Sequence, residues 1–416
     1  MNPRLLLFGL GLGTVGGGLA SGLAAGPRLE WIVAHVTEPI GRVFLRLLFM
    51  LVIPLLFSAL SVGIASIDLR QLGRMGARTL AYTVVVSAIA VAIGIVLVQT
   101  IRPGEGVAAS LRGRAAAAPP PAAPAQATGV DFFVQLIPDN PVRAAANGDM
   151  LGVLVFALFL GVGLAMTRTP AADRLRETLE GLYDVSMRLI GLVIRLAPAG
   201  VAALVFTLTA RLGLEVLLSL GWYIGTVLLG LSIHQFVVYS LAVRYLGGMS
   251  PRFFFRGIRL AMITAFSTAS SNATLPTALR VAEEELRLPQ HVSRFVLTVG
   301  ATMNQNGTAL FEGVTVLFLA QLYGIDLTVS QQAIVVGVCI LGGIGTAGVP
   351  AGSLPVVVMI LGMIGVPAEG VGLILGVDRL LDMCRTTLNV SGDLAAAVVI
   401  ARAEGARVPS NGPHAA

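Results

Sequence analysis

The sequence predicts an all-α polytopic membrane protein, and composition is the first reason. Of its 416 residues, 56% are hydrophobic and only 12% are charged, and the mean hydropathy is +0.86. Soluble domains carry about 25% charged residues. Long stretches of this chain therefore suit only lipid or a protein interior, which excludes an ordinary soluble enzyme.

Six apolar segments are the second reason, because each is long enough to cross a bilayer as one helix. They cover residues 4–25, 41–66, 79–101, 148–167, 184–208 and 214–243. The first could also be a cleaved signal peptide, but its apolar length of about 20 residues favours a membrane helix. Between the third and fourth segments, the Ala/Pro-rich residues 103–147 are expected to form a flexible external loop.

The basic residues predict the orientation. The formal net charge is +6, and all 28 basic residues are arginines. They gather in alternate short loops, around 70–78, 168–176 and 244–259. By the positive-inside rule these loops are cytoplasmic, as are both termini. Membrane orientation explains the positive charge, so no nucleic-acid partner is expected.

Beyond residue 250, small polar residues interrupt the apolar stretches. The two interruptions are Ser267–Pro276 and Gly342–Ser353. Their apolar flanks are only about 10 to 15 residues long, too short to cross alone, so we expect two re-entrant helical hairpins whose tips meet inside the protein. Pro276 and Pro350 are each predicted in the first turn of a returning half-helix.

Each hairpin is followed by an apolar span that contains polar residues, over 292–321 and 371–401. In the first of these spans, the run Asn304–Thr308 would leave polar groups unsatisfied in lipid, so this break must face protein or water. Duplicated, interrupted segments of this kind are typical of a transporter with its site near the bilayer midplane.

The strongest chemical signal is a polar stripe on the last helix. Asp378, Asp382, Arg385, Asn389 and Asp393 follow one another at spacings of 4, 3, 4 and 4, which places them on one helix face. Such charges in an apolar membrane helix cost several kcal/mol unless they are paired or hydrated. We therefore interpret these residues first as a functional site. The alternative is an internal ion pair that only stabilises the helix bundle.

This stripe suits an acidic amino acid as ligand. Arg385 offers a planar fork for a carboxylate, and Asp382 offers a counter-charge for an ammonium group. The amino termini of the hairpin half-helices also favour a substrate carboxylate. Asp378, Asp382 and Asp393 are the candidate proton carriers.

An all-oxygen cage for a hard monovalent cation is also predicted. It would combine the Asp393 carboxylate, the Asn389 carbonyl, and backbone carbonyls freed at Gly300 and Asn304.

Four stretches in this order resemble the signature motifs of the glutamate/aspartate transporter family, the dicarboxylate/amino acid:cation symporters. They are Ser270–Pro276, Asn304–Thr308, Gly345–Pro350 and Asp382–Asp393, and the likeness covers nearly the whole chain. It implies a prokaryotic homologue of the excitatory amino acid transporters, in a bacterial or archaeal inner membrane. It also implies eight transmembrane helices, two re-entrant hairpins, inverted repeats, a homotrimeric scaffold and a transport domain that moves as an elevator.

The resemblance also implies substrate contacts. By motif position these are Ser270, Ser271, Thr308, Gly348, Val349, Asp382, Arg385, Thr386 and Asn389. Arg385 would bind the side-chain carboxylate of the substrate and Asp382 its amino group. Family members that carry dicarboxylates without an amine generally lose the acid at the Asp382 position, so its presence favours aspartate or glutamate.

Departures from the family pattern bear on the coupling ion. Relatives driven by several sodium ions read Asn-Met-Asp-Gly-Thr at the break, where this chain has Gln305 and Asn306, and Val86 stands where a third-span hydroxyl is usual. We expect one cation cage to be retained, at Gly300, Asn304, Asn389 and Asp393. A second cation site would use the altered set Thr302, Gln305 and Thr346. A third cation site, at Thr83, Ser87 and Asn306, is expected to be lost. We therefore expect coupling to protons or to fewer sodium ions.

The predicted organisation follows from the spans and the resemblance. The scaffold consists of spans 1 and 2 (residues 1–78) and spans 4 and 5 (residues 148–212). The transport domain consists of span 3 (residues 79–102) and residues 213–401. The external loop covers residues 103–147 and the cytoplasmic tail residues 402–416. Within 213–401, span 6 is followed by hairpin 1 at 252–282, span 7 at 290–322, hairpin 2 at 330–364 and span 8 at 368–401.

The predicted function is secondary active symport of aspartate or glutamate. The alternatives are a C4-dicarboxylate or neutral amino acid symporter of the same family and, from another class, an ion channel, whose pore would need polar residues along its whole length. An enzyme is disfavoured because no nucleophile–base pair or metal set is visible. Expected partners are the substrate, lipid and further copies of the chain. No cofactor is expected, and sodium is a candidate co-transported ion beside the proton.

Overall fold

The computed structural model describes residues 3–23, 27–65, 73–105, 137–147, 150–212, 215–345, 353–367, 370–406 and 408–409. In these residues the regular structure is entirely helical, without strands, which confirms the all-α fold class. Most of the external loop and part of the tail lie outside the described residues, so their predicted flexibility stays a prediction.

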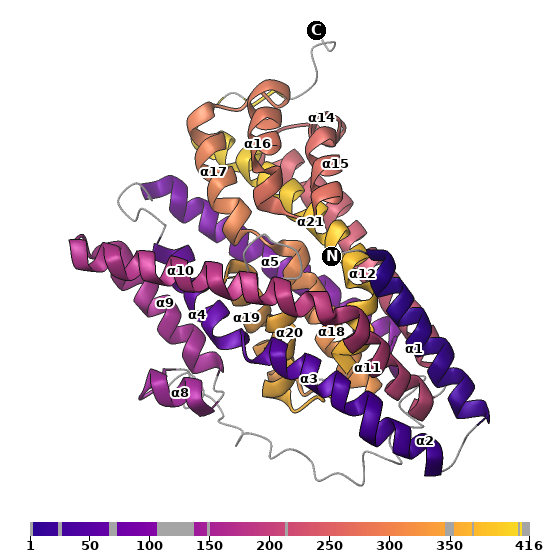
Figure 1. Ribbon diagram of the computed structural model, residues 1–416. Helices are drawn as coiled ribbons and strands as arrows, with labels where there is room; N and C mark the ends of the chain where they lie inside the picture. The colour runs from indigo at the N-terminus through magenta and orange to yellow at the C-terminus, as the bar shows by residue number, and fades with distance from the viewer. Residues whose placement is uncertain are drawn as a thin grey trace.

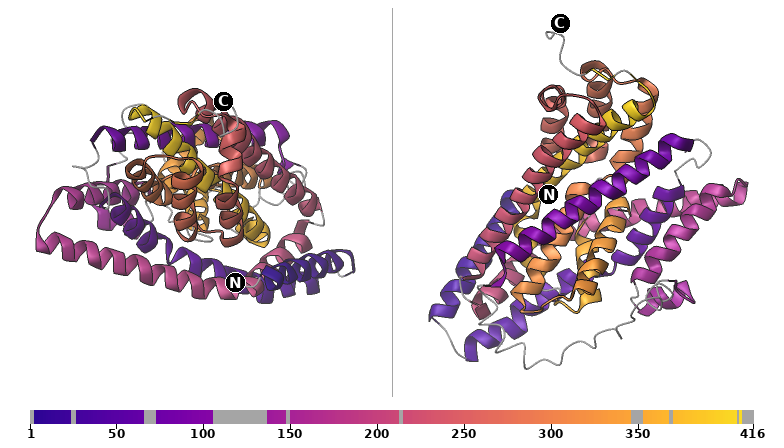
Figure 2. Two further views of the ribbon diagram at one scale, coloured as in Figure 1. Left: turned by 90° about the horizontal axis from the view of Figure 1, so that it is seen from above. Right: turned by 180° about the vertical axis from the view of Figure 1, so that it is seen from behind.

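The amino-terminal half forms an outer layer. Its helices are α1 (Pro3–Leu23), α2 (Pro27–Ile32), η1 (Val33–Thr37), α3 (Glu38–Phe49), α4 (Val52–Ala65), α8 (Pro141–Asn147), α9 (Met150–Met166), α10 (Pro170–Val193), η2 (Ile194–Leu196) and α11 (Ala197–Leu212). α1 packs along α11, and α10 runs the length of one side (Figures 1 and 2). Glycine allows the close approach of α1, because a Cβ at Gly13 would lie 2.5 Å from the Ala202 carbonyl oxygen.

The expected fifth span is not one straight helix. α10 begins at Pro170, well before residue 184, and a bend of 59° separates α10 from α11. Pro198 stands at the second position of α11 and cannot donate a backbone N–H, so the hydrogen-bond ladder of α10 cannot continue through it. The expected second span is likewise divided, between Phe49 and Val52.

The inner group of helices comes from α5 and from the carboxyl-terminal half. Its elements are α5 (Gly73–Ile101), α12 (Glu215–Ile233), η3 (His234–Val238), α13 (Tyr239–Leu241), η4 (Ala242–Leu246), α14 (Pro251–Gly257), α15 (Arg259–Thr268), α16 (Ser271–Arg280), η5 (Val281–Glu285), α17 (Gln290–Met303), α18 (Asn306–Leu322), α19 (Val329–Gly345), α20 (Leu354–Ile364) and α21 (Val371–Ala403). α14 to α17 gather at one end of the molecule (Figure 1).

The first hairpin turns at Ala269 and Ser270, between α15 and α16. Ala269 has a positive φ of 49°, and the Ser270 side chain caps α16 by accepting a hydrogen bond from the Ala273 backbone N–H. The prediction for Pro276 is wrong, since it is the sixth residue of α16 and not in its first turn. The serine cap starts the helix before the proline.

The second hairpin consists of α19 and α20. Its connection, including Thr346, Gly348, Val349 and Pro350, lies outside the described residues. Predictions for these four residues therefore stay predictions.

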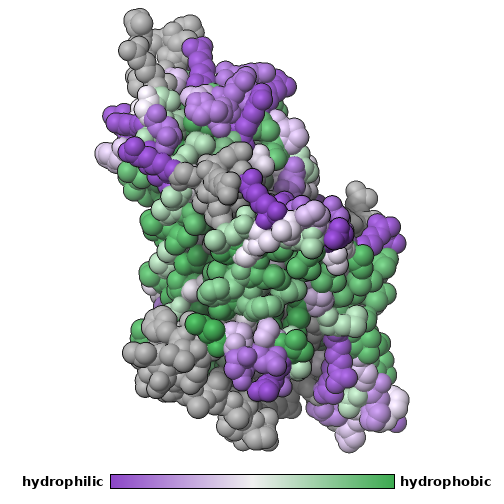
Figure 3. Space-filling model, turned by 90° about the vertical axis from the view of Figure 1, so that its left-hand side faces the viewer, coloured by the Kyte–Doolittle hydropathy of each residue, from purple (hydrophilic) through white to green (hydrophobic). Residues whose placement is uncertain are grey.

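Surface and length both fit a membrane environment. Hydrophobic side chains form a band across one face of the molecule, with hydrophilic groups at both ends (Figure 3). Among the described residues, Arg74–Ile101 and Leu218–Leu246 are long and apolar enough to cross a membrane, and the bent pair α10–α11 would be a third such segment. The count of eight spans stays a prediction.

Candidate functional site

The polar stripe of α21 lies inside the protein, as its spacing predicts. Asp378, Asp382, Arg385, Asn389 and Asp393 are all buried, and Arg385 is only 1% exposed. They occupy the middle of a 33-residue helix that packs against α15, α17 and α18.

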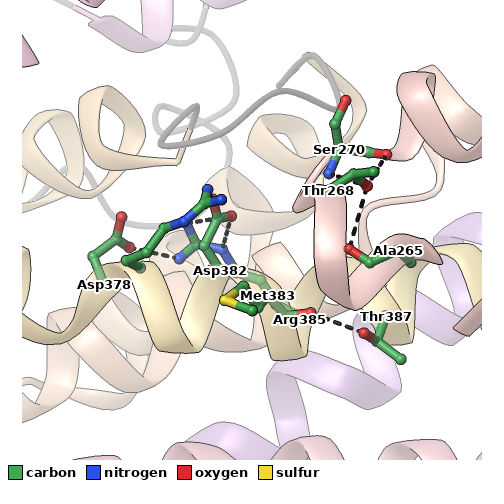
Figure 4. Close-up of polar contacts among 9 residues, drawn as sticks. Ala265, Thr268, Ser270, Asp378, Asp382, Met383, Arg385 and Thr387 are labelled. Carbon is green, nitrogen blue, oxygen red and sulfur yellow. Dashed lines mark hydrogen bonds and ion pairs between the residues drawn. The ribbon is translucent and has the colours of Figure 1, made fainter. Parts of the chain in front are cut away.

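Arg385 is held between two carboxylates of its own helix (Figure 4). Its Nε donates a hydrogen bond of 3.0 Å to Asp382 Oδ1. Nη2 lies 2.9 Å from the same oxygen, and Nη1 lies 3.0 Å from Asp378 Oδ1. These Nη contacts are ion pairs without hydrogen-bond geometry. The outer edge of the guanidinium therefore keeps N–H groups that a bound anion could use.

Two neighbours on α18 shape the space around Arg385. Its guanidinium carbon lies 4.1 Å above the centre of the Phe311 ring, a cation–π distance. Gly307 packs on the Arg385 backbone, where a Cβ would come within 2.7 Å of the carbonyl oxygen. A larger residue at 307 would push α18 away from the arginine.

The predicted break between α17 and α18 is present. Asn304 and Gln305 have non-helical dihedral angles, and Asn389 of α21 closes the gap. Asn389 Oδ1 accepts from the Gly307 N–H at 2.7 Å, while its Nδ2 donates to Gln305 and, at 3.2 Å, to Thr308 Oγ1. Asn389 thus joins α21 to α18, and both its amide oxygen and its amide nitrogen form hydrogen bonds within the protein.

The remaining substrate candidates differ in availability. Ser271 is 2% exposed, and within the described part of the chain its Oγ has no hydrogen-bond partner. Ser270 is the cap of α16. Thr386 and Thr308 are each 5% exposed. The Ser271 hydroxyl is therefore able to bind a ligand without breaking a hydrogen bond to the described part of the chain.

The cage predicted at Asp393 is assembled in part. Asn304 Nδ2 donates to Asp393 Oδ1 at 2.9 Å, and Asn304 Oδ1 has no partner in the described ranges. A Cβ at Gly300 would lie 2.5 Å from the same carboxylate. The Gly300 carbonyl is not fully freed, since it accepts from the Asn304 N–H at 2.8 Å. These oxygens fit a hard cation beside a carboxylate.

The second and third cation sets are less complete. Thr302 Oγ1 donates to the Val299 carbonyl of its own helix, and Gln305 Nε2 donates to the Ala301 carbonyl. In the third set, Ser87 donates to Asn306 Oδ1 at 2.6 Å, and Thr83 is buried nearby on α5. Val86 is buried and offers no oxygen. None of Thr83, Ser87 and Asn306 carries a negative charge that would offset the desolvation of a buried sodium ion.

Glu312 is the main residue that sequence reasoning missed. It lies on α18, is 0% exposed, and in the described chain neither carboxyl oxygen has a hydrogen-bond partner. A Cβ at Gly342 of α19 would lie 3.2 Å from its Oε2. The signal was an acid one turn after Thr308, within the otherwise apolar Leu310–Val314.

No transition-metal centre is visible in the described ranges, since no three His, Cys, Asp or Glu side chains gather to hold one. The site gathers buried polar side chains of α18, of α21 and of the break between α17 and α18 around Arg385.

Comparisons with known proteins find relatives over most of the chain. Residues 6–403 match the sequence model of the sodium:dicarboxylate symporter family. The proton/glutamate-aspartate symporter of Escherichia coli is 34% identical over 90% of this chain and 87% of its own length. The proton/sodium-glutamate symport protein of Bacillus subtilis is 33% identical over 88% of this chain and 86% of its own length. Human excitatory amino acid transporter 2 is 32% identical over 94% of this chain and 76% of its own length.

Proposed function

The chain belongs to the sodium:dicarboxylate symporter family, and on that premise we propose that it carries aspartate or glutamate across a membrane together with a cation. Members of this family are symporters, so the chain is an integral membrane transporter and not an enzyme. The observation that carries the substrate assignment is the buried Arg385, whose Nη groups face two acids without forming hydrogen bonds.

A substrate carboxylate can take over the outer edge of this guanidinium, because a fork of N–H groups matches two carboxylate oxygens. Asp382, released in part from Arg385, would then face the substrate amino group. Ser271 and the start of α16 would add N–H and O–H donors for the second carboxylate. A substrate with two carboxylates and one ammonium uses all of these groups. Succinate has no ammonium group to compensate Asp382, and alanine has no side-chain carboxylate to compensate Arg385.

Coupling to protons, or to fewer sodium ions than several-sodium relatives use, is the second part of the proposal. The third cation set does not fit sodium, whereas Asp393 with Asn304 could hold one ion. Glu312 supports a proton, because a carboxyl group in an apolar interior is stable only when it is neutral or faces a cation. We add it to Asp378, Asp382 and Asp393 as a candidate proton carrier.

The remaining architecture is proposed on the family resemblance. The outer layer of helices would be the homotrimeric scaffold, and the inner group would move as an elevator in an inner membrane with both termini cytoplasmic. One support is the outward face of α1, where Leu5, Phe8, Leu12, Val15 and Leu19 are each more than half exposed. Such a stripe needs lipid or another subunit to cover it.

Uptake by the purified protein in liposomes tests the substrate assignment. Labelled aspartate, glutamate, succinate and alanine should be offered under matched gradients, and saturable uptake of the two acidic amino acids alone is expected. Saturable succinate uptake would favour the dicarboxylate carrier, and alanine uptake the neutral carrier. Ion current without saturable uptake would favour the channel.

Sodium and proton gradients imposed separately test the coupling. We expect an inward proton gradient to drive aspartate uptake, and Glu312→Gln to abolish that drive while binding persists, because the amide cannot exchange a proton. Uptake by Glu312→Gln that still follows the proton gradient would exclude Glu312 as the carrier. Aspartate affinity that rises with the second or third power of sodium concentration would reject the proposed coupling.

A further inference from the structure

Tyr239 is a buried residue for which the mechanism above has no role. It is 0% exposed and follows a five-residue π-helical turn, His234–Val238, in the long helix that begins as α12. Its backbone N–H donates to the His234 carbonyl, closing that turn. The wide turn aims the phenol inward, toward the break between α17 and α18.

The Tyr239 hydroxyl stands in a directed chain of hydrogen bonds. Ser87 Oγ of α5 donates to Asn306 Oδ1 at 2.6 Å, and Asn306 Nδ2 donates to the Tyr239 hydroxyl at 3.0 Å. That hydroxyl in turn donates to the Leu388 carbonyl of α21 at 3.3 Å. Each donor in the chain is used once, and four separate helical segments are joined.

Packing fixes the phenol in this position. Gly392 leaves room for it, because a Cβ there would collide with the Tyr239 hydroxyl oxygen. The His234 ring meets the phenol edge to face, with centroids 4.8 Å apart. The hydroxyl therefore has one location, between the Asn306 amide nitrogen and the Leu388 carbonyl.

A sodium ion at this point would need oxygen ligands. The Leu388 carbonyl is one, but Asn306 presents its amide nitrogen. We propose that the Tyr239 hydroxyl occupies the position of a third co-transported cation and joins α5, α18 and α21 in its place. Tyr239 is thus a residue that determines cation specificity, and substrate binding needs no sodium at this point. The inference rests on the proposed transport function. It adds the residue that prevents a cation from binding at the third site.

The charge of residue 306 determines what removal of the hydroxyl does. With Asn306 present, Tyr239→Phe leaves a neutral gap and an amide N–H without a partner. With Asn306→Asp, the carboxylate can accept from both Ser87 and Tyr239, so it needs no cation. Only when both changes are combined do a carboxylate and the Leu388 carbonyl border a gap the size of the lost oxygen.

The test measures aspartate binding by the full-length protein across a wide sodium range at fixed ionic strength. The set is the unmodified protein, Tyr239→Phe, Asn306→Asp and the double variant. Tyr82→Phe is the matched control, because Tyr82 is also a buried tyrosine near Asp393 and its hydroxyl has no partner within the described residues.

We expect Tyr239→Phe to weaken aspartate binding about tenfold, because an amide donor beside Gly307 and Thr308 loses its acceptor. Its dependence on sodium should equal that of the unmodified protein. Tyr82→Phe should change affinity less than about twofold, since no hydrogen bond is lost. The double variant should gain about one power of sodium dependence over Asn306→Asp.

Equal sodium dependence in the double variant and Asn306→Asp would overturn the inference. If the double variant does not fold, Asn306→Asp alone decides, because a new sodium dependence with Tyr239 intact would show that the hydroxyl does not exclude the ion. Unchanged sodium dependence there would support the inference. Failure of the unmodified protein to bind aspartate or glutamate would instead reject the proposed function.

Discussion

The outer layer of helices and the inner group bury opposite kinds of groups. α1 buries glycines against α11 and exposes an apolar stripe, whereas α18 and α21 bury amides, carboxyls and a guanidinium. In lipid, apolar contact gives little preference for one helix partner over another, so small residues that allow close approach determine the packing. Where polar groups are buried between helices, hydrogen bonds determine which helices pack together.

This difference teaches that the two regions should fail for different reasons. A change in the outer layer should alter stability or assembly and leave ligand selectivity alone. A change in the inner group should alter binding before it alters stability. Matched variants on the same helix can separate these effects.

Arg385→Ala should have the largest effect. It leaves Asp378 and Asp382 buried without their shared cation, a loss of about 3–5 kcal/mol, so aspartate binding should become undetectable. Arg379→Ala is the control, because Arg379 is 30% exposed and lies 4.0 Å from Asp382. Calorimetric titration of both proteins checks this, and aspartate binding at unchanged affinity in Arg385→Ala would contradict the substrate assignment.

Gly13→Val tests the outer layer. A side chain there meets the Ala202 carbonyl oxygen at 2.5 Å, and overpacking of this kind costs about 1–3 kcal/mol. We expect a lower thermal midpoint in detergent, with aspartate affinity unchanged in the protein that stays folded. Gly11→Val, whose Cβ would meet nothing within 4 Å, should match the unmodified protein. Equal midpoints for the two variants would show that this contact does not determine α1 packing.

Gly300→Ala probes the inner group by the same steric means. Its Cβ would lie 2.5 Å from Asp393 Oδ1, which should move the carboxylate away from Asn304. The expected result is a loss of any sodium effect on aspartate binding and an affinity about tenfold weaker. Gly337→Ala on α19 is open to solvent or lipid and serves as the control. A sodium effect preserved in Gly300→Ala would argue against a cage at Asp393.

Ser271→Ala should have the smallest effect. The Ser271 hydroxyl has no protein partner in the described chain, so its removal costs only a hydrogen bond to substrate, about 0.5–1.5 kcal/mol. Affinity for aspartate should fall by up to about tenfold with stability unchanged. Equal affinities for aspartate in the two proteins would remove Ser271 from the substrate contacts.

Regular periodicity made the α21 stripe predictable from the sequence. A single helix carries Asp378, Arg385 and Asp393 on one face, so spacing alone gives their common burial. The break at Asn304 was predictable for a similar reason, since polar groups in an apolar span must find partners.

Other features had weaker local signals. Glu312 is one acid in an apolar run, and its importance depends on what α19 leaves unpaired around it. Tyr239 reads as an ordinary aromatic of a membrane span, because a π turn has no sequence signature in this chain. The prediction that Pro276 lies in the first turn of its helix was wrong, because Ser270 caps that helix earlier in the chain.

The helix that carries Tyr239 contains two π-helical segments, His234–Val238 and Ala242–Leu246, with no loop between them. Each widened turn holds a residue that a regular α-helix would have no room for. Loss of a single codon within 234–238 could therefore leave an intact, equally apolar helix. The residues on either side of such a deletion would keep their faces, because the widened turn closes to a regular one, whereas the same loss within the regular α12 would rotate them by about 100° relative to each other. This stretch should consequently tolerate the loss of one residue better than the regular part of the same helix does.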